Sequence, residues 1–266
     1  MSNGITASVT RAGAYEPFDL QVSRGQIMGH SPTNIFAYGT TPATAGLFRT
    51  VWENMATTDY VFPTSASTMT LVSTVNTDTA TITINGTDSS YNLISENLVL
   101  NGTTGVTTVN SYFRINNILV SVGSSTNPTG VITLSVSSTV YAQINTQVVN
   151  GTTTSIGTSQ MGVYTVPNGF TFYGFRYGAY SSFNGNTANY TTYRALTNSS
   201  SGVQRVIVQT PYNTSYEVQR HFPFPYVGGT DLRFQVASSA ATAAVVSINI
   251  GGVLIQNNVN VTVPGG

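Results

Sequence analysis

Thr79-Ala80-Thr81-Ile82-Thr83-Ile84 is the stretch of sequence that decides the fold class. Apolar side chains take every second position in it, and threonines take the positions between them. Successive side chains of a β-strand point to opposite faces of the sheet, so the pattern predicts a strand with one buried face. The same alternation places Ile132, Leu134 and Val136 on one face of a second stretch, and both stretches therefore favour sheet over helix.

Turn residues punctuate the strands. Asn85-Gly86, Asn101-Gly102 and Asn150-Gly151 tolerate the positive φ angles that tight turns need. Gly228-Gly229 and Gly251-Gly252 lack the following Lys and Ser or Thr of a phosphate-binding loop, so we interpret them as hairpin turns. Short strands rich in Thr and Val, separated by turns, predict an all-β fold of antiparallel sandwiches.

A change in composition divides the chain. Residues 151–158 are rich in Gly, Ser and Thr, which is typical of a linker, and a new strand begins near Met161. We therefore predict two antiparallel β-sandwich or jelly-roll-like domains, at residues 58–150 and 159–266. Residues 1–57 hold Gly and Pro without a clear period, and predict an extended N-terminal arm. Such an arm either wraps a neighbouring subunit or lies along its own sandwich.

Ionisable side chains are scarce. The 266 residues include nine Arg, no Lys, nine Asp or Glu, two His and no Cys, so 7% of the chain is charged, against roughly 25% in an average soluble domain. The 40% hydrophobic content and zero net charge argue against disorder. Without a basic run we expect no nucleic-acid partner, and without a long apolar stretch or a signal peptide we expect no membrane partner.

Catalytic and metal-binding patterns are not found in the sequence. His30 and His221 lie in unrelated contexts, and no metal-ligand spacing is present, so we expect no catalytic residue, no metal and no cofactor. A polysaccharide depolymerase that uses Asp88 and Glu96 is the enzymatic alternative. The simpler interpretation is that Glu96 pairs with an arginine such as Arg114 across neighbouring strands.

Aromatic residues supply the candidates for contact with a partner, because aromatic anchors are enriched at the centres of interfaces. The candidate interface residues are Trp52, Tyr60, Phe62, Tyr180, Tyr190, His221, Phe222, Phe224 and Tyr226. Tyr180 and Tyr190 belong to a Tyr-rich segment that could be core, subunit interface or a groove that stacks on sugar rings. The two prolines in residues 221–226 remove backbone donors, so this segment is predicted to be an edge strand or a loop that meets a neighbouring subunit.

Four stretches resemble virion proteins of tailed phages, especially marine and cyanobacterial ones. They are Ser23-Arg24-Gly25-Gln26 with Gly29-His30, Val51-Trp52-Glu53 with Tyr60-Val61-Phe62-Pro63, Ile84 to Thr103, and Val163 to Gly169. The resemblance implies a non-enzymatic capsid decoration or cement protein on the virion surface, made in the host bacterial cytoplasm. Its partners would be its own copies in a homotrimer and the major capsid protein or tail proteins. The alternative is a tail or fibre module that binds a receptor or glycan.

Overall fold

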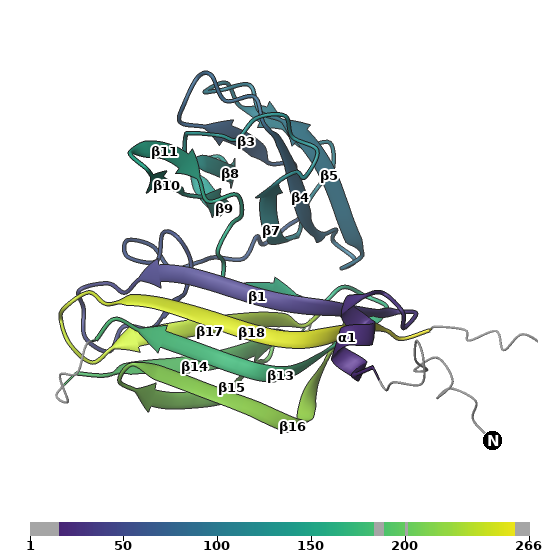
Figure 1. Cartoon of the computed structure of the whole chain (residues 1–266), viewed down its shortest axis with the longest axis vertical. Helices are drawn as coiled ribbons and strands as arrows, with labels where there is room; N and C mark the ends of the chain where they lie inside the picture. Colours follow the sequence, from purple (N-terminus) through teal and green to yellow (C-terminus); the bar gives the residue numbers. More distant parts are fainter. Residues whose placement is uncertain (1–15, 184–188, 200–201, 259–266) are drawn as a thin grey trace, which may run out of the picture.

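The computed structural model describes residues 16–183, 189–199 and 202–258. In this part of the chain strands make up nearly all of the regular structure, and the one helix is the short α1 (Phe18–Ser23). The strands gather into two bodies, one above the other in Figure 1. The prediction of an all-β fold is confirmed.

The lower body in Figure 1 is a sandwich of two antiparallel sheets. The first sheet has the order β1-β18-β13-β16, from β1 (His30–Thr40), β18 (Val245–Gln256), β13 (Phe170–Ser181) and β16 (Ser215–Val227). The second has the order β12-β17-β14-β15, with β2 beside β17, from β2 (Arg49–Thr50), β12 (Val163–Thr165), β14 (Thr191–Asn198), β15 (Gln204–Tyr212) and β17 (Asp231–Ser238).

The chain crosses between these two sheets in the manner of a jelly roll. After β13 in the first sheet it forms β14 and β15 in the second, returns to the first with β16, and then alternates through β17 and β18. This connectivity sets each strand against the opposite sheet, so that both inner faces fill one core. We call this body the jelly-roll domain.

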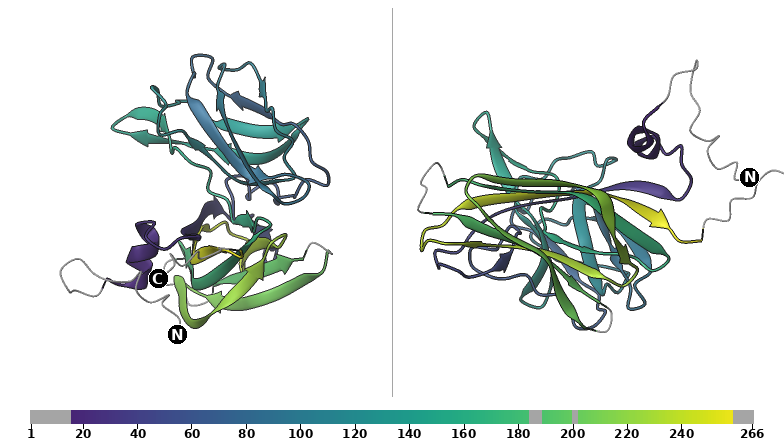
Figure 2. Two further views of the ribbon diagram at one scale, coloured as in Figure 1. Left: turned by 90° about the vertical axis from the view of Figure 1, so that its right-hand side faces the viewer. Right: turned by 90° about the horizontal axis from the view of Figure 1, so that it is seen from below.

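The upper body is inserted into the jelly roll between β2 and β12, and we call it the insertion domain. Its sheets have the orders β6-β3-β8-β9 and β5-β4-β7, and a separate ribbon pairs β10 with β11. Its strands are β3 (Thr70–Ser73), β4 (Thr81–Thr87), β5 (Leu93–Val99), β6 (Val106–Thr107), β7 (Arg114–Val120), β8 (Ile132–Val136), β9 (Thr139–Ile144), β10 (Thr146–Val149) and β11 (Thr152–Ser155). The left view of Figure 2 shows it standing over the jelly-roll domain.

Two segments without a clear period in the sequence are strands in the structure. Residues 30–40, within the predicted N-terminal arm, form β1, which pairs with β18 along its whole length. Residues 152–155, within the predicted linker, form β11 of the ribbon with β10. Residues 1–15 of the arm lie outside the described residues. The arm region thus lies along the chain's own sandwich from His30 onward, and it supplies an edge of the first sheet.

The alternating residues form the core as predicted. Ile82 and Ile84 on β4, and Ile132 and Leu134 on β8, have no exposed surface, while Val136 is half-buried. Buried apolar residues of both domains belong to one continuous cluster. The cluster is continuous because apolar residues of the insertion domain pack against apolar residues of the jelly roll at the domain boundary.

Two of the predicted glycine turns are wrong. Asn85-Gly86 lies inside β4, and Gly251-Gly252 lies in the middle of β18. At Gly86 a Cβ atom would stand 2.1 Å from the carbonyl oxygen of Arg114, so the position requires glycine for close approach. Asn150-Gly151 does form a turn, with φ angles of 50° and 78°.

Gly252 is expected to be indispensable while its neighbour Gly251 is not. A Cβ at Gly252 would lie 2.3 Å from the Phe172 ring and 2.4 Å from the Tyr173 carbonyl oxygen, whereas one at Gly251 meets nothing closer than 3.6 Å. Gly252→Ala should therefore lower the free energy of unfolding by about 1–3 kcal/mol, the usual cost of overpacking. Gly251→Ala is the matched control, and urea denaturation that gives equal losses for both variants would contradict the packing of β18.

Candidate functional site

A buried ion pair joins the two domains. Arg114 is the first residue of β7 in the insertion domain, and Asp231 is the first residue of β17 in the jelly roll. The Arg114 Nε donates to Asp231 Oδ1 at 3.0 Å, and its Nη2 donates to Oδ2 at 2.9 Å. Arg114 and Asp231 are only 8% and 4% exposed. This two-pronged geometry fixes both the distance and the angle between their strands.

The remaining polar atoms of the pair are also satisfied. Arg114 Nη1 donates to the carbonyl oxygens of Pro63, at 2.9 Å, and Phe113, at 2.8 Å. The Thr165 hydroxyl donates to Asp231 Oδ1 at 2.6 Å, and the guanidinium lies 3.9 Å from the centre of the Phe113 ring. A buried ion pair is tolerated when its polar atoms have hydrogen-bond partners, and here each guanidinium nitrogen and both carboxylate oxygens have at least one.

The predicted pairing of Glu96 with an arginine such as Arg114 is wrong. Glu96 instead accepts hydrogen bonds from the backbone N–H groups of Val109, at 2.9 Å, and Asn110, at 3.3 Å. Asp88, the other carboxylate of the depolymerase alternative, accepts from the backbone N–H of Asn92 at 2.9 Å. Both carboxylates hold loops in place.

The chain enters and leaves the insertion domain through two segments that lie side by side, which we call the neck. The Gly162 N–H donates to the Val51 carbonyl at 2.6 Å, and the Val51 N–H donates to the Phe234 carbonyl at 3.0 Å. Glu53 accepts a hydrogen bond from the Gln160 N–H through one carboxylate oxygen, and its other oxygen is buried without a partner. Burial raises the pKa of Glu53 to about 8, so the carboxyl is protonated at neutral pH.

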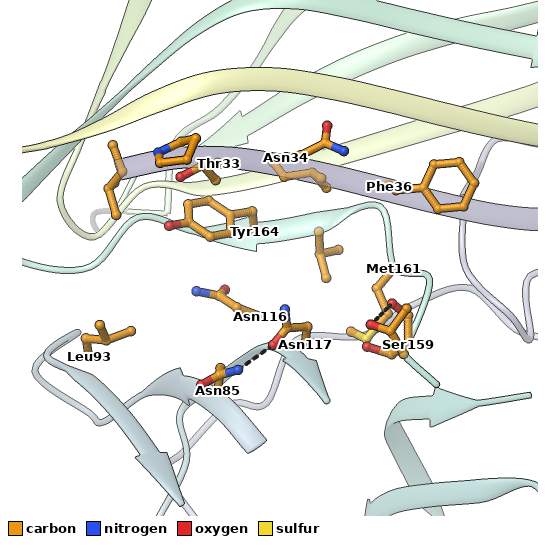
Figure 3. A pocket seen from close by; sticks show the side chains of 15 residues that line it. Thr33, Asn34, Phe36, Asn85, Leu93, Asn116, Asn117, Ser159, Met161 and Tyr164 are labelled. Carbon is orange, nitrogen blue, oxygen red and sulfur yellow. Dashed lines mark hydrogen bonds between the residues drawn. The ribbon is translucent and has the colours of Figure 1, made fainter. Parts of the chain in front are cut away.

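A groove of about 530 Å³ lies between β1 and the insertion domain. Figure 3 shows Asn85, Asn116 and Asn117 on one side of it, facing β1, with Tyr164 between them and the strand. Asn116 bridges the domains, since its amide donates to the Thr165 carbonyl at 3.0 Å and accepts from the Thr165 N–H at 2.8 Å. The residues that line the groove carry no acidic or basic side chain.

An exposed apolar edge lies on the opposite side of the jelly roll. Residues 220–223 of β16 stand opposite the single residue Phe175 of β13, so this part of β16 bulges outward. The bulge leaves Phe222 90% exposed. Beside it, between the end strands β15 and β16, a cleft of about 390 Å³ is lined by Ile207, Phe224 and Tyr226 among others. We call this surface the β15–β16 edge; it is formed by residues 203–207 and 221–227.

The nine predicted interface residues fall into separate groups. Trp52 and Tyr60 are buried in the core, and the Trp52 Nε1–H donates to the Thr58 carbonyl at 3.0 Å, so their side chains offer no surface to a partner. Tyr226 is 7% exposed and lines the cleft beside β15. Phe62 is half-buried, with its ring 5.0 Å from the Arg114 guanidinium. The remaining five are exposed: Tyr180, Tyr190, His221, Phe222 and Phe224.

The exposed candidates do not all lie together. His221, Phe222 and Phe224 share β16, which is an end strand of its sheet as the prolines predicted. The Tyr180 hydroxyl donates to Glu217, and Tyr190 borders a shallow hollow with Gln209 and Asn213. The sequence analysis missed the ion pair and the asparagines of the groove, because no local pattern connects residues such as Arg114 and Asp231 that stand 117 positions apart.

Metal ligands and membrane-spanning helices are missing from the described part of the chain. Among residues 16–183, 189–199 and 202–258, no three His, Asp or Glu side chains gather in a group that could hold a metal ion. His30 contacts the Met28 carbonyl at 3.0 Å, and His221 is exposed on the bulge. No helix in these residues has the length and apolar character needed to cross a membrane.

Removal of one partner of the ion pair should destabilise the whole protein. Asp231→Asn leaves the Arg114 charge buried without its counter-charge, and the free energy of unfolding should fall by about 3–5 kcal/mol. The matched control is Arg176→Gln, which breaks the exposed Arg176–Glu217 pair, 3.7 Å apart, and should cost about 1 kcal/mol or less. Similar urea midpoints for the two variants would refute the structural role of the buried pair.

Protonation of Glu53 predicts a pH-dependent stability. Its pKa is about 8 in the folded chain and near its ordinary value of 4.5 in the unfolded chain, so between these values the folded state binds the extra proton. The Glu53 contribution is complete below pH 4.5 and is lost as the pH rises to about 8. Compared with Glu53→Gln, which keeps a neutral acceptor for Gln160, the wild type should lose stability from pH 5 to pH 8. A constant difference between the two across this range would disprove the assignment.

Comparisons with known proteins give only distant likenesses. No family model matches the chain, and no curated protein matches it in sequence. Among solved structures, that of infectious bursal disease virus strain Gt is 11% identical with a TM-score of 0.21, over 86% of this chain and 73% of the other. T=1 particles derived from infectious bursal virus give 10% identity and a TM-score of 0.25, over 86% and 70%. The Gx strain gives 10% and 0.23, over 94% and 80%.

Proposed function

We propose that this protein is a non-enzymatic structural component of a viral particle, and that it assembles through the β15–β16 edge. The observation that carries this proposal is the outward bulge of β16, which holds Phe222 90% exposed. An exposed aromatic ring keeps apolar surface in contact with water, which is unfavourable. A partner surface that covers the ring would bury this area and gain free energy. Jelly rolls are a common architecture of viral capsid proteins, which supports this role.

The composition of the edge suits a permanent contact. Val203 and Val227 are exposed and line the cleft together with Phe224, and Phe222 is exposed on the same strand as Phe224. Arg205 is the one charged residue among the described residues that line the cleft. End strands also present unpaired backbone N–H and C=O groups to a neighbour. A contact built mainly from apolar burial and neutral hydrogen bonds responds weakly to salt.

More specifically, we propose a capsid decoration or cement protein of a tailed phage. In this role copies of the chain form a homotrimer and bridge subunits of the major capsid protein on the virion surface. Support comes from the resemblance of the sequence to tailed-phage virion proteins and from the small number of ionisable side chains. Two of these side chains, Asp88 and Glu96, accept hydrogen bonds from backbone N–H groups of loops. Tail proteins are the other class of partner that the resemblance implies.

Substitution of Phe222 should weaken assembly while the fold is kept. Phe222→Ser removes the exposed ring, and because a central aromatic contributes about 2 kcal/mol or more at an interface, the association constant should fall at least tenfold. Val122→Ser is the control, since Val122 is fully exposed on the insertion domain. Sedimentation equilibrium measures the oligomeric state, and thermal melts check the fold. A wild type that stays monomeric at high concentration and does not bind phage capsids would overturn the proposal.

A further inference from the structure

We propose that the groove between β1 and the insertion domain is a binding site for a neutral oligosaccharide. The groove lies at a domain boundary, and its volume of about 530 Å³ is within the range of about 300–1,000 Å³ that is typical of small-ligand sites. It belongs to a different surface from the β15–β16 edge. The proposal therefore does not depend on the assembly role.

The walls of the groove are built from both domains. β1 supplies Thr33, Asn34 and Phe36, and the insertion domain supplies Asn85 and Asn117. Figure 3 shows Asn85 and Asn117 joined by a hydrogen bond, 2.8 Å long, and facing the strand across the gap. A ligand between these walls would touch the two domains at once.

The chemistry of the walls matches sugars better than charged ligands. Each asparagine amide offers two donors and an acceptor, and a sugar hydroxyl can both donate and accept. The Asn85–Asn117 bond uses only one donor and one acceptor of this pair, and Asn34 makes no side-chain hydrogen bond to the described residues. No charged side chain lines the groove to pair with a phosphate, a carboxylate or an ammonium group.

Aromatic surface completes the match. Phe36 is 42% exposed at the groove, and the Tyr164 ring lies between β1 and the asparagines. The apolar face of a sugar ring packs on such rings while its hydroxyls reach the amides. An extended peptide that adds a strand to β1 fits less well, because Pro32 lines the groove and has no N–H to pair.

The groove is held in shape before any ligand binds. Asn116 and Thr165 form two hydrogen bonds across the domain boundary, and the Ile118 N–H donates to the Ser159 hydroxyl at 3.0 Å. The Arg114–Asp231 pair holds the same boundary. A preformed site loses less conformational entropy on binding, which matters for ligands that bind mainly through neutral hydrogen bonds.

The test is binding of a panel of neutral and acidic oligosaccharides of two to four sugars to the full chain, followed by calorimetric titration of each one that binds. Phe36→Ala and Asn117→Ala should each weaken binding about tenfold, the effect of losing one good contact. Tyr38→Ala is the control for the ring, because Tyr38 shares the face of β1 with Phe36, is 46% exposed and lies outside the groove. Asn97→Ala is the control for the amide, since Asn97 accepts from Thr83 at 2.8 Å on the far strand β5.

Both controls should bind within twofold of the wild type, and all four variants should melt near the wild-type temperature. The proposal is overturned if no neutral oligosaccharide binds, if only acidic sugars bind, or if Phe36→Ala and Asn117→Ala bind as the wild type does. Unrelated extended peptides are added as competitors for the groove in the same assay. If they displace a bound sugar, and if Phe36→Ala and Asn117→Ala weaken peptide binding as much as sugar binding, the groove is assigned to strand addition instead. Loss of assembly in Phe222→Ser with unchanged sugar binding would separate this site from the assembly role.

Discussion

The Arg114–Asp231 ion pair is the constraint on which the arrangement of the two domains depends. Removing both charges from water costs several kcal/mol, and the close two-pronged geometry, the hydroxyl of Thr165 and the two carbonyl groups offset that cost. An apolar contact could hold the domains together as strongly, but it would allow them to slide. A fixed fork of hydrogen bonds allows one relative orientation, and both the neck and the groove lie within a few residues of it.

The local patterns of the sequence predicted the elements, and long-range pairing decided how they combine. Alternation at Ile82, Ile84, Ile132 and Leu134 identified buried faces because that period is a property of each strand alone. The prolines of β16 identified an end strand for the same kind of reason. By contrast, β1 shows no clear period in the sequence, because Phe36 and Tyr38 on its exposed face are apolar like Ile35 and Ala37 on its buried face. Its pairing with β18 shows that it is a strand.

The candidate site was predictable only in part. Phe222 and Phe224 are exposed on an end strand, as the proline-rich segment indicated, and their contact with a partner stays a prediction. Trp52 and Tyr60 have the same composition signal but pack in the core, so residue type alone does not distinguish an anchor from a core residue. The turn predictions at Asn85-Gly86 and Gly251-Gly252 were wrong for a related reason. Gly86 and Gly252 allow neighbouring strands of a sheet to approach closely, and the sequence does not distinguish this requirement from a turn.

The neck brings the two ends of a whole domain to one point, where the Gly162 N–H meets the Val51 carbonyl. A segment whose ends are neighbours can be exchanged for another of similar end spacing without altering the path of the host chain. The two jelly-roll sheets are therefore continuous through the neck, and their pairing does not depend on the length of chain between Val51 and Gly162. Insertions and deletions in the insertion domain are therefore expected to leave the strand order of the two jelly-roll sheets unchanged.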